Sequence, residues 1–571
     1  MIDRNNPCLL WPALIEKAYL KVRGGYDFPG SNSGTDLWVL SGWIPEQVFL
    51  HREDVTSEQL WKRLFTAFRY GDVLLTIGTG NLSEQEQKLL GLISQHDYAV
   101  LDMKESNGCR QMLIKNPWAE TKTKTNDKSE QNGRFWMDCK KVFQNFDNLY
   151  LNWNPCIFRY REDIHFSWDL LTGRGIPGCF AMNPQFAVSS YDGGSVWLLL
   201  CKHFRTDENF QLQSLLESSL DGSESEFISI YVYKKDGRKV YLSDGAIHRG
   251  PYVDSPNTLM RFEMPANTTY TIVAAEQSLP SLKQNFTLSA FSTAPVKLAR
   301  VRDKYGYTFT TQGTWTSATA GGNAESARYP SNPQFILHLS DMADVSILLE
   351  TPNPDLAVHV KLFWSHGKRV SSFRKRDIVV DSGDYRPGCA VADTEQLGKG
   401  QYTIVCSTFA PDQLASFTLN ISSTMQCDVE PLATEAAGRR VVISDIGVFH
   451  PGTDRILASL SAPRLTRVKL IARSRGSTIG SRAVGASPML MSVELGQGPY
   501  KEILAQSERG EYSDAISGIR IDDFDLKPEL KEREGTWIVL ERINSPGGSI
   551  EDHIEVEALA EERVEIGEWT T

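Results

Sequence analysis

The stretch HDYAVLDMKESNGCRQMLIKNPW, residues 96–118, decides how the first part of the chain folds. Two β-prone runs flank Asn107-Gly108, a dipeptide that favours a two-residue hairpin turn because both residues accept positive φ. The pattern predicts one strand over residues 98–103 and a second over residues 110–115. We therefore expect a β-hairpin whose open end lies at the two ends of the stretch.

The open end of this hairpin brings His96 and Asn116 together, and Pro117 stops the second strand because proline cannot donate to a ladder. An amide oxygen that accepts a hydrogen bond from one imidazole N–H fixes the tautomer, and the other nitrogen can then take a proton from a thiol. The spacing makes His96 a candidate general base, Asn116 its orienting partner and Trp118 a shield against water. The alternative, an ordinary surface histidine at a strand end, stays open at this point.

Three segments resemble one family of enzymes. The His-x-Tyr-x-Val and Asn-Pro-Trp motifs within residues 96–118 resemble the histidine and asparagine segment of the calpain cysteine proteases. Residues 10–21 (LWPALIEKAYLK) resemble the Trp-Pro helix of calpains, and residues 135–155 (FWMDCKKVFQNFDNLYLNWNP) resemble the end of their protease core. The last segment is most similar to the PalB-like calpains of fungal ambient-pH signalling. Gln95 and Ala119 replace glycines of the family pattern, but neither removes a functional side chain.

The family's nucleophile is a cysteine in a Gly-Asp-Cys-Trp setting upstream of the Trp-Pro helix, and the chain contains no such motif. Cys8 is the nearest thiol, but its Asn-Pro-Cys-Leu-Leu setting matches nothing around the nucleophile. We expect Cys8 to be a buried small hydrophobic residue. The resemblance therefore implies an N-terminally truncated calpain core that has two of the three catalytic residues and should not cleave a peptide bond alone.

Length and composition indicate a globular protein of several domains. The chain has 571 residues, of which 41% are hydrophobic and 23% charged, as is usual for a globular protein. A chain of this length is too long for a single hydrophobic core. A net charge of −11 argues against nucleic-acid binding. We expect no transmembrane segment, because no apolar run reaches the length of a spanning helix. The 9 cysteines form no Cys-x-x-Cys pair, which favours reduced thiols and a cytoplasmic location.

From residue 156 onward, short alternating runs bounded by turn residues predict antiparallel β-structure. The motif Asn-Pro-Gln-Phe occurs at residues 183–186 and again at 332–335. In each copy a hairpin is expected to follow, turning at Asp236-Gly237 in the first and at His366-Gly367 in the second. The same order of matched segments predicts duplicated β-sandwich domains.

The predicted fold class is α+β, the C-terminal half of a papain-like calpain protease core followed by two or three antiparallel β-sandwich domains. The second sandwich resembles the calpain-type sandwich that follows the protease core, and the last domain is a fainter, divergent copy. The expected domains span residues 1–155 (protease core), 156–295 (first sandwich), 296–426 (second sandwich) and 427–571 (third, divergent domain).

Two other motifs indicate no site. Gly78-Thr79-Gly80 follows an apolar run, but the third glycine and the Lys-Ser/Thr pair of a phosphate-binding loop are missing. Asp522, Asp523 and Asp525 come closest to an EF-hand loop but lack its turn glycine and closing glutamate, so we expect a solvated acidic turn. We therefore assign no metal ligand and no cofactor, and leave calcium open.

The resemblance implies a cysteine endopeptidase in which Asn116 holds the ring of His96 while His96 takes the proton of a thiol. It also implies a PacC-type zinc-finger transcription factor as the protein substrate, and association with the endosomal sorting machinery. Two alternatives stay open. The missing cysteine favours an inactive scaffold built on the β-sandwiches, and a calcium-dependent lipid-binding module would require acidic loops that the sequence does not show convincingly.

Overall fold

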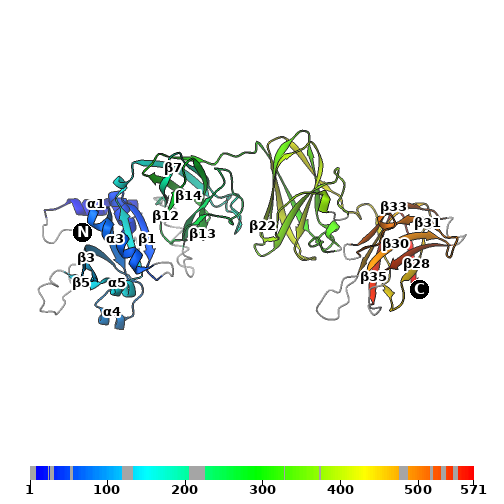
Figure 1. Ribbon diagram of the computed structural model, residues 1–571, viewed down its shortest axis with the longest axis horizontal. Helices are drawn as coiled ribbons and strands as arrows, with labels where there is room; N and C mark the ends of the chain where they lie inside the picture. The colour runs from blue at the N-terminus through cyan, green and yellow to red at the C-terminus, as the bar shows by residue number, and fades with distance from the viewer. Residues whose placement is uncertain are drawn as a thin grey trace. The chain divides into compact units, whose positions relative to one another are not determined.

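The computed structural model describes residues 8–23, 25, 31–51, 56–118, 133–204, 226–326, 328–371, 375–474, 487–514, 518–528, 535–543 and 551–571. The chain divides into two compact units, described separately here: Met1–Gly175 with Phe180–Asp303, and Ile176–Cys179 with Lys304–Thr571. Within the described ranges, all α-helices precede residue 146, and the rest of the chain is built from strands (Figure 1).

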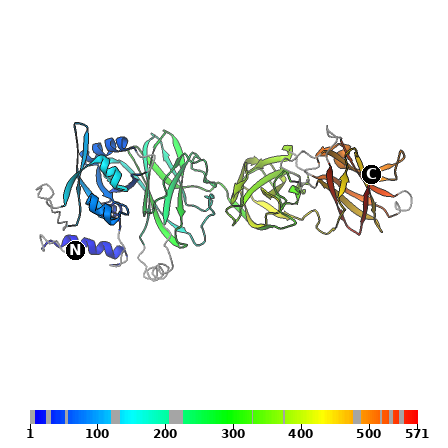
Figure 2. The ribbon, with the colours of Figure 1, turned by 90° about the horizontal axis from the view of Figure 1, so that it is seen from below.

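The first unit begins with a six-stranded antiparallel sheet of order β1-β6-β2-β3-β4-β5 and its helices. The amphipathic helix α3 buries Leu60, Trp61 and Leu64, whereas α1, drawn next to the N label in Figure 2, buries no residue. The elements are α1 (Trp11–Val22), α2 (Ser33–Ser41), β1 (Ile44–Phe49), α3 (Ser57–Tyr70), β2 (Val73–Gly78), α4 (Glu84–Leu90), β3 (Asp97–Ser106), β4 (Cys109–Lys115), β5 (Arg134–Asp138), α5 (Cys139–Asn145) and β6 (Asn148–Trp153).

The predicted hairpin is confirmed and is longer than predicted. Strands β3 and β4 pair as far as Ser106 opposite Cys109. Asn107 and Gly108 have φ values of 49° and 76°, as a two-residue turn of type I′ requires. The register shifts by one residue between Val100 and Asp102, so the turn and this β-bulge together set which residues face each other at the open end of the hairpin.

The first unit continues with two sheets, β11-β10-β13-β8-β15 and β12-β9-β14-β7, which enclose one apolar core. Strand β15 pairs with β8, so the predicted boundary between residues 295 and 296 lies before the last strand of this sandwich. The elements are the 3-10 turn Pro155–Ile157, β7 (Tyr160–Asp169), β8 (Gln185–Ser190), β9 (Gly194–Lys202), β10 (Phe227–Tyr233), β11 (His248–Arg249), β12 (Asn257–Met264), β13 (Thr268–Gln277), β14 (Lys283–Ser292) and β15 (Val296–Arg300).

The second unit opens with sheets β16-β24-β18-β22 and β20-β19-β23-β17-β25, again around one core, with β21 paired to β19. Strand β25 pairs with β17, so the predicted boundary between residues 426 and 427 also falls one strand early. The elements are β16 (Tyr307–Trp315), β17 (Gln334–Leu339), β18 (Ala343–Glu350), β19 (Ala357–Trp364), β20 (Ile378–Asp381), β21 (Arg386–Pro387), β22 (Cys389–Leu397), β23 (Gly400–Thr408), β24 (Ala415–Ser423) and β25 (Cys427–Leu432), with 3-10 turns at Tyr329–Ser331 and Lys375–Asp377.

The repeated Asn-Pro-Gln-Phe motif has the same contacts in both sandwiches. The amide of Gln185 donates to the carbonyl of Val240 and accepts its N–H, at 2.6 and 2.8 Å. Gln334 makes the same two bonds with Val370, at 3.0 and 2.8 Å. The turns predicted ahead of these valines are present, but the predicted hairpins are wrong in their second arms. Each arm leaves the ladder, because the glutamine amide takes the backbone bonds of the valine.

The remainder of the second unit consists of sheets β26-β35-β29-β33 and β31-β30-β34-β28-β36, with β27 paired to β35 and β32 to β30. The elements are β26 (Arg440–Ile443), β27 (Gly447–Phe449), β28 (Arg455–Ser461), β29 (Thr466–Ser474), β30 (Pro488–Leu495), β31 (Glu502–Gln506), a 3-10 turn (Ser507–Gly510), β32 (Ser513–Asp514), β33 (Ile519–Leu526), β34 (Thr536–Arg542), β35 (Asp552–Ala560) and β36 (Glu565–Thr570).

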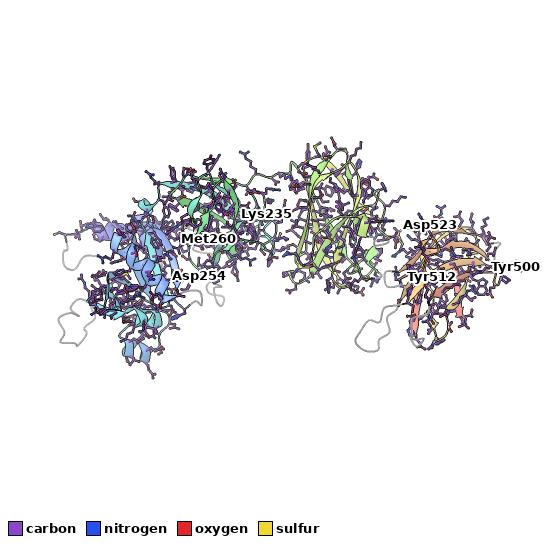
Figure 3. All side chains as sticks on the ribbon, viewed as in Figure 1. Lys235, Asp254, Met260, Tyr500, Tyr512 and Asp523 are labelled. Atoms are coloured by element: carbon purple, nitrogen blue, oxygen red, sulfur yellow. The ribbon has the colours of Figure 1, made fainter. Side chains whose placement is uncertain are left out.

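The acidic turn predicted at Asp522, Asp523 and Asp525 is wrong, because all three residues lie within strand β33. The carboxylate of Asp523, labelled in Figure 3, accepts two hydrogen bonds from Arg439, at 2.5 and 3.0 Å. Asp525 lies 3.5 Å from the guanidinium of Arg467. Ion pairs with Arg439 and Arg467 therefore account for two of these carboxylates.

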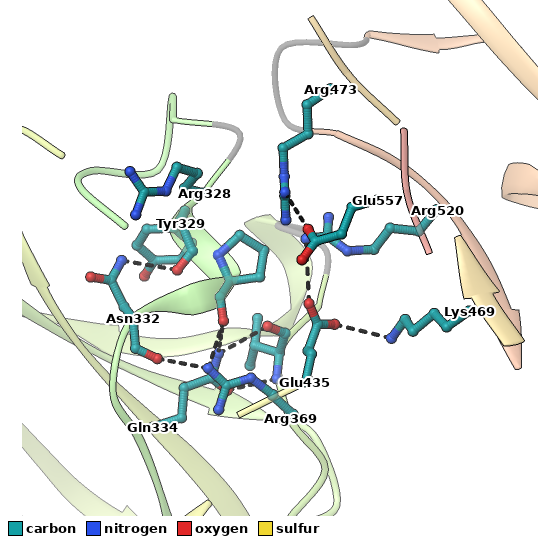
Figure 4. A network of polar contacts seen from close by, with 12 residues as sticks. Arg328, Tyr329, Asn332, Gln334, Arg369, Glu435, Lys469, Arg473, Arg520 and Glu557 are labelled. Atoms are coloured by element: carbon teal, nitrogen blue, oxygen red, sulfur yellow. Dashed lines mark hydrogen bonds and ion pairs between the residues drawn. The ribbon is translucent and has the colours of Figure 1, made fainter. Parts of the chain in front are cut away.

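Two polar clusters lie where the second sandwich continues into the third, and the charges of Arg369 and Glu435 interact between them (Figure 4). The guanidinium of Arg369 donates to the carbonyls of Pro330 and Ala433, at 2.8 and 3.0 Å. In the third sandwich, the carboxylate of Glu435 lies 3.0 Å from Lys469 and 3.8 Å from Arg520. Burial raises the pKa of Glu435, but the two cations outweigh burial and leave that pKa below its ordinary value.

Candidate active site

His96 and Asn116 meet at the open end of the β3–β4 hairpin. The Nε2 atom of His96 lies 2.9 Å from Oδ1 of Asn116, which is 6% exposed. The same Oδ1 accepts the backbone N–H of Trp118 at 3.0 Å, which assigns this atom as the amide oxygen. An oxygen acceptor places the imidazole proton on Nε2, so Nδ1 presents a lone pair. The arrangement can therefore receive a proton at Nδ1.

Two aromatic rings hold the imidazole. The ring centroid of Trp118 lies 4.6 Å from that of His96, and the centroid of Tyr98 lies 4.9 Å away in an edge-on arrangement. Tyr98 is buried, and its hydroxyl accepts the N–H of Ile93 at 2.8 Å. Trp118 is 60% exposed, so it covers the imidazole while its own outer surface faces solvent. The imidazole therefore lies between the buried ring of Tyr98 and the solvent-exposed ring of Trp118.

The backbone of His96 is clamped by Thr79. The N–H of Thr79 donates to the His96 carbonyl at 3.0 Å, and the N–H of His96 donates to Oγ1 of Thr79 at 3.0 Å. The Thr79 hydroxyl in turn donates to the carbonyl of Ile93 at 2.6 Å. Thr79 is 5% exposed, so these bonds have no competition from solvent. One buried side chain therefore sets the position of the imidazole-bearing residue.

Two residues next to this clamp, Gly80 and Gln95, have unusual backbone surroundings. A Cβ at Gly80 would lie 1.8 Å from the carboxylate of Asp147, so a larger residue here would displace that side chain. Gln95 has a φ of 50°, and its N–H donates to the carbonyl of Gly80 at 2.9 Å. This left-handed conformation explains why the calpain pattern has glycine where this chain has Gln95. Ala119, the other departure, lies outside the described residues.

A carboxylate lies next to the imidazole in sequence. Asp97 accepts the N–H of Ser33, the first residue of α2, at 2.7 Å. Burial raises the pKa of Asp97, and the hydrogen bonds from Ser33 oppose that effect. The side chain ties α2 to the start of β3, immediately beside His96.

The structure brings together all three residues singled out in the sequence, His96, Asn116 and Trp118. Sequence reasoning missed Thr79. Its signal was present as a threonine between two glycines at the end of an apolar strand, but the triplet had been compared only with phosphate-binding loops. Spacing alone could not show that its hydroxyl reaches the backbone of a residue so much further along the chain.

The cysteines give one correction. Cys8 was expected to be buried and is exposed, so the interpretation as a core residue is wrong. Of the other eight cysteines, Cys109 and Cys156 are also exposed, Cys427 is partly exposed and the rest are buried. Within the described residues, no group of three or more His, Cys, Asp or Glu side chains is arranged to hold a metal ion. None of the helices described is long and apolar enough to cross a membrane.

Comparison with known protein families finds two matches. Residues 2–152 match the calpain family cysteine protease model, and residues 435–571 match the C-terminal domain of palB-like calpain-like proteases. The first match begins at residue 2, so it does not support the predicted N-terminal truncation of the core.

Curated relatives agree with these matches over the full chain. A calpain-like protease palB/RIM13 of Aspergillus oryzae is 66% identical, over all of this chain and 68% of the relative. A calpain-like protease palB of Emericella nidulans is 62% identical, again over all of this chain and 68% of the relative. A palB/cpr-8 protein of Neurospora crassa is 35% identical, over all of this chain and 72% of the relative. With identity of this level along its whole length, the chain belongs to the PalB-like family of calpain cysteine proteases.

Proposed function

We propose that His96, Asn116 and Trp118 form the base side of the peptide-cleaving site. His96 takes the proton of a catalytic thiol at Nδ1, and the thiolate attacks the peptide carbonyl. The imidazolium then delivers that proton to the leaving amine, and water hydrolyses the thioester. The observation that carries this proposal is the 2.9 Å contact between Nε2 of His96 and Oδ1 of Asn116, which leaves Nδ1 for the thiol.

We further propose that none of the chain's nine cysteines is the nucleophile. None has the Gly-Asp-Cys-Trp setting of the family, and a thiolate nucleophile needs a site that lowers its pKa. Burial raises the pKa of Cys139 to about 12. A hydrogen bond from Cys179 lowers the pKa of Cys389, but both of these cysteines belong to the second unit, whereas His96 belongs to the first. This chain on its own is then expected to be inactive, and the reaction needs no metal or other cofactor. Calcium dependence is a separate question that chelation during the assay answers.

The substrate in this proposal is a protein of the PacC transcription-factor type, cleaved in response to alkaline pH. Family membership supports a protein substrate, and the names of the relatives support a place in palB-type signalling. The proposed location is the cytoplasm, in association with the endosomal sorting machinery. Nucleic acid is not a proposed partner, since the net charge is −11.

The proposal is tested by labelling the native protein with an epoxide inhibitor of cysteine proteases and identifying the alkylated residue by mass spectrometry. We expect the labelled peptide to contain none of the nine cysteines of this chain, and labelling to be lost in the variant His96→Ala. Labelling of one of the nine cysteines of this chain would overturn the proposal about the nucleophile. Absence of any His96-dependent labelling would overturn the endopeptidase proposal and favour the scaffold alternative, which the missing Gly-Asp-Cys-Trp motif supports.

A further inference from the structure

A polar cleft of about 1000 Å³ lies within the first unit, where the six-stranded sheet meets the first sandwich. Its walls include helix α3 and three strands, β1, β11 and β12. Met260, which lies on β12, is labelled in Figure 3. Among the described strands, each of these three is the last of its sheet. Each therefore has backbone N–H and C=O groups on one side with no strand to pair them, and such an edge is a template for another extended chain.

One wall of the cleft holds a buried amide without a partner. Asn257, the first residue of β12, is 7% exposed and lines the cleft. Among the residues that the structure describes, none forms a hydrogen bond with its Nδ2 or its Oδ1. Leaving a buried amide unpaired is unfavourable by roughly 1–3 kcal/mol, so a polar ligand that pairs it would gain that amount. Asn257 thus points to a ligand with both donors and acceptors, as a peptide backbone has.

Beside β1 the charges of the cleft are unbalanced in favour of an anion, whereas Glu263 of β12 adds a carboxylate elsewhere in the lining. Glu46 of β1 accepts from Arg63 of α3 and lies 2.8 Å from the guanidinium of Arg261 of β12. Two guanidinium groups therefore share one carboxylate, which is 10% exposed. Burial lowers the pKa of Arg261, and Glu46 only partly opposes that effect. A second carboxylate placed here would complete the pairing of both arginines.

The two arginines are held rigidly in place. The guanidinium of Arg63 lies 4.8 Å from the ring of Trp153, and that of Arg261 lies 5.1 Å from the ring of Trp197. The two tryptophans meet edge-on at 5.3 Å, and Nε1 of Trp153 donates to Glu46 at 2.7 Å. Stacked guanidinium groups keep their hydrogen-bonding forks oriented before a ligand arrives, which lowers the entropy lost on binding.

We infer that this cleft is a second binding site for the protein substrate, which takes an extended acidic segment as an added strand. The backbone of the segment pairs with the free strand edges and Asn257, and a carboxylate side chain lies between Arg63 and Arg261. The inference rests on the proposed function as a protein-cleaving enzyme. The chemistry recognised is an extended peptide with acidic side chains on one face.

The register of the sheet connects this cleft to His96. Phe49 at the end of β1 pairs with Asn148, Asn148 pairs with Gly78, and Gly78 pairs with Asp97, the neighbour of His96. Phe49, at one end of the cleft wall, and His96 are therefore at the same end of the sheet, separated by three strand spacings or about 14 Å. An extended segment of about five residues spans that distance. The acidic segment of a substrate would thus lie a short way along the chain from the cleaved bond.

Fluorescence anisotropy tests the inference with a fluorescein-labelled peptide of alternating threonine and glutamate, and a second peptide with glutamine in place of glutamate. We expect the acidic peptide to bind at least about tenfold more tightly than its glutamine counterpart. The variant Arg249→Glu, at an exposed position of the cleft wall, should weaken binding of the acidic peptide by about tenfold. The matched control Arg238→Glu makes the same charge change outside the cleft and should leave binding unchanged.

A second variant separates binding from folding. Because the amide of Asn257 has no partner in the described structure, Asn257→Ala should leave the melting temperature nearly unchanged while it weakens binding. Hydrogen exchange should show peptide-dependent protection in β1, β11 and β12. The inference would be overturned if neither peptide binds or if both peptides bind equally. It would also be overturned if Arg249→Glu and Arg238→Glu have equal effects, or if the peptide protects other strands instead.

The proposed function fails separately from this inference. Peptide binding is expected to survive His96→Ala, because the cleft does not include His96. Loss of epoxide labelling with intact, Arg249-dependent peptide binding would therefore reject the catalytic proposal alone. Intact, His96-dependent epoxide labelling without Arg249-dependent peptide binding would reject only the second binding site.

Discussion

The Nε2 atom of His96 lies 2.9 Å from Oδ1 of Asn116, and the second hydrogen bond to that Oδ1, from the N–H of Trp118, fixes the amide orientation. The two side chains come from opposite ends of one hairpin, so their distance depends on its turn and on the register shift between Val100 and Asp102. The imidazole tautomer is therefore set by three residues of one local element before any substrate binds.

Thr79 is predicted to be a positioning residue for the reaction. Thr79→Val keeps the shape but removes the hydroxyl that binds the N–H of His96 and the carbonyl of Ile93. We expect kcat to fall by about tenfold or more with little change in KM, because the base moves while substrate contacts stay. Steady-state cleavage by the native protein measures this. Thr79→Ser should restore kcat, and a valine variant with wild-type kcat would show that the clamp has no catalytic role.

Gln95 is predicted to store backbone strain. Its φ of 50° is a conformation that side chains disfavour, and the residue is exposed. Gln95→Gly should stabilise the first unit by up to about 1 kcal/mol, since the relief of strain exceeds the added entropy of the unfolded chain. Gln95→Val should destabilise it, because β-branched residues tolerate this region poorly. Urea unfolding compares the variants, and a loss of stability in Gln95→Gly would contradict the account.

The hairpin shows what could be predicted from sequence. Asn107-Gly108 defined the turn, and alternation of side chains defined both strands, so the meeting of His96 with Asn116 followed from local information. The contact between Thr79 and His96 could not be predicted, because it depends on the pairing of β2 with β3 across helix α4.

The sandwich domains show a second limit. The copies were found from repeated motifs, but the second arms of the predicted hairpins were wrong, because the side-chain amides of Gln185 and Gln334 take up the backbone hydrogen bonds of Val240 and Val370. The boundaries were misplaced for a related reason. Strands β15 and β25 are short runs whose partners lie far back in sequence, so composition alone did not assign them.

The stability of the second sandwich is predicted to fall in acid because of His359. The residue is 1% exposed, and burial, with the ammonium of Lys361 3.4 Å from its Nε2, lowers its pKa to about 4. The unfolded chain binds a proton near pH 6.5 and the folded chain near pH 4, so stability falls as pH decreases between these values, by about 3 kcal/mol. Thermal unfolding of the wild type and of His359→Gln, between pH 7 and pH 4 in buffers of about equal ionic strength, measures this loss of stability.

The control for this prediction is His338→Gln, at a partly exposed histidine of the same sandwich. We expect His338→Gln to show the pH dependence of the wild type, and His359→Gln to be less sensitive to acid. Identical pH profiles for all three proteins would contradict the assignment of the effect to His359.

Glu435 is predicted to stabilise the network between the second and third sandwiches. Glu435→Gln leaves Lys469 and Arg520 without this counter-charge, and Arg520 is 8% exposed. We expect a loss of about 3 kcal/mol in the free energy of unfolding, measured by guanidinium titration. Glu430→Gln, at an exposed position of β25, makes the same chemical change and should have little effect. A similar small effect for both variants would reject the stabilising role.

The central claim is that His96 is the general base of this PalB-like calpain. The most direct measurement is the rate at which the native protein cleaves an unfolded protein substrate, compared with the variants His96→Ala and His338→Ala. Loss of a general base lowers the rate by about 10²- to 10⁴-fold, so His96→Ala should be nearly inactive while His338→Ala cleaves at the wild-type rate. Cleavage by His96→Ala at the wild-type rate would contradict the claim.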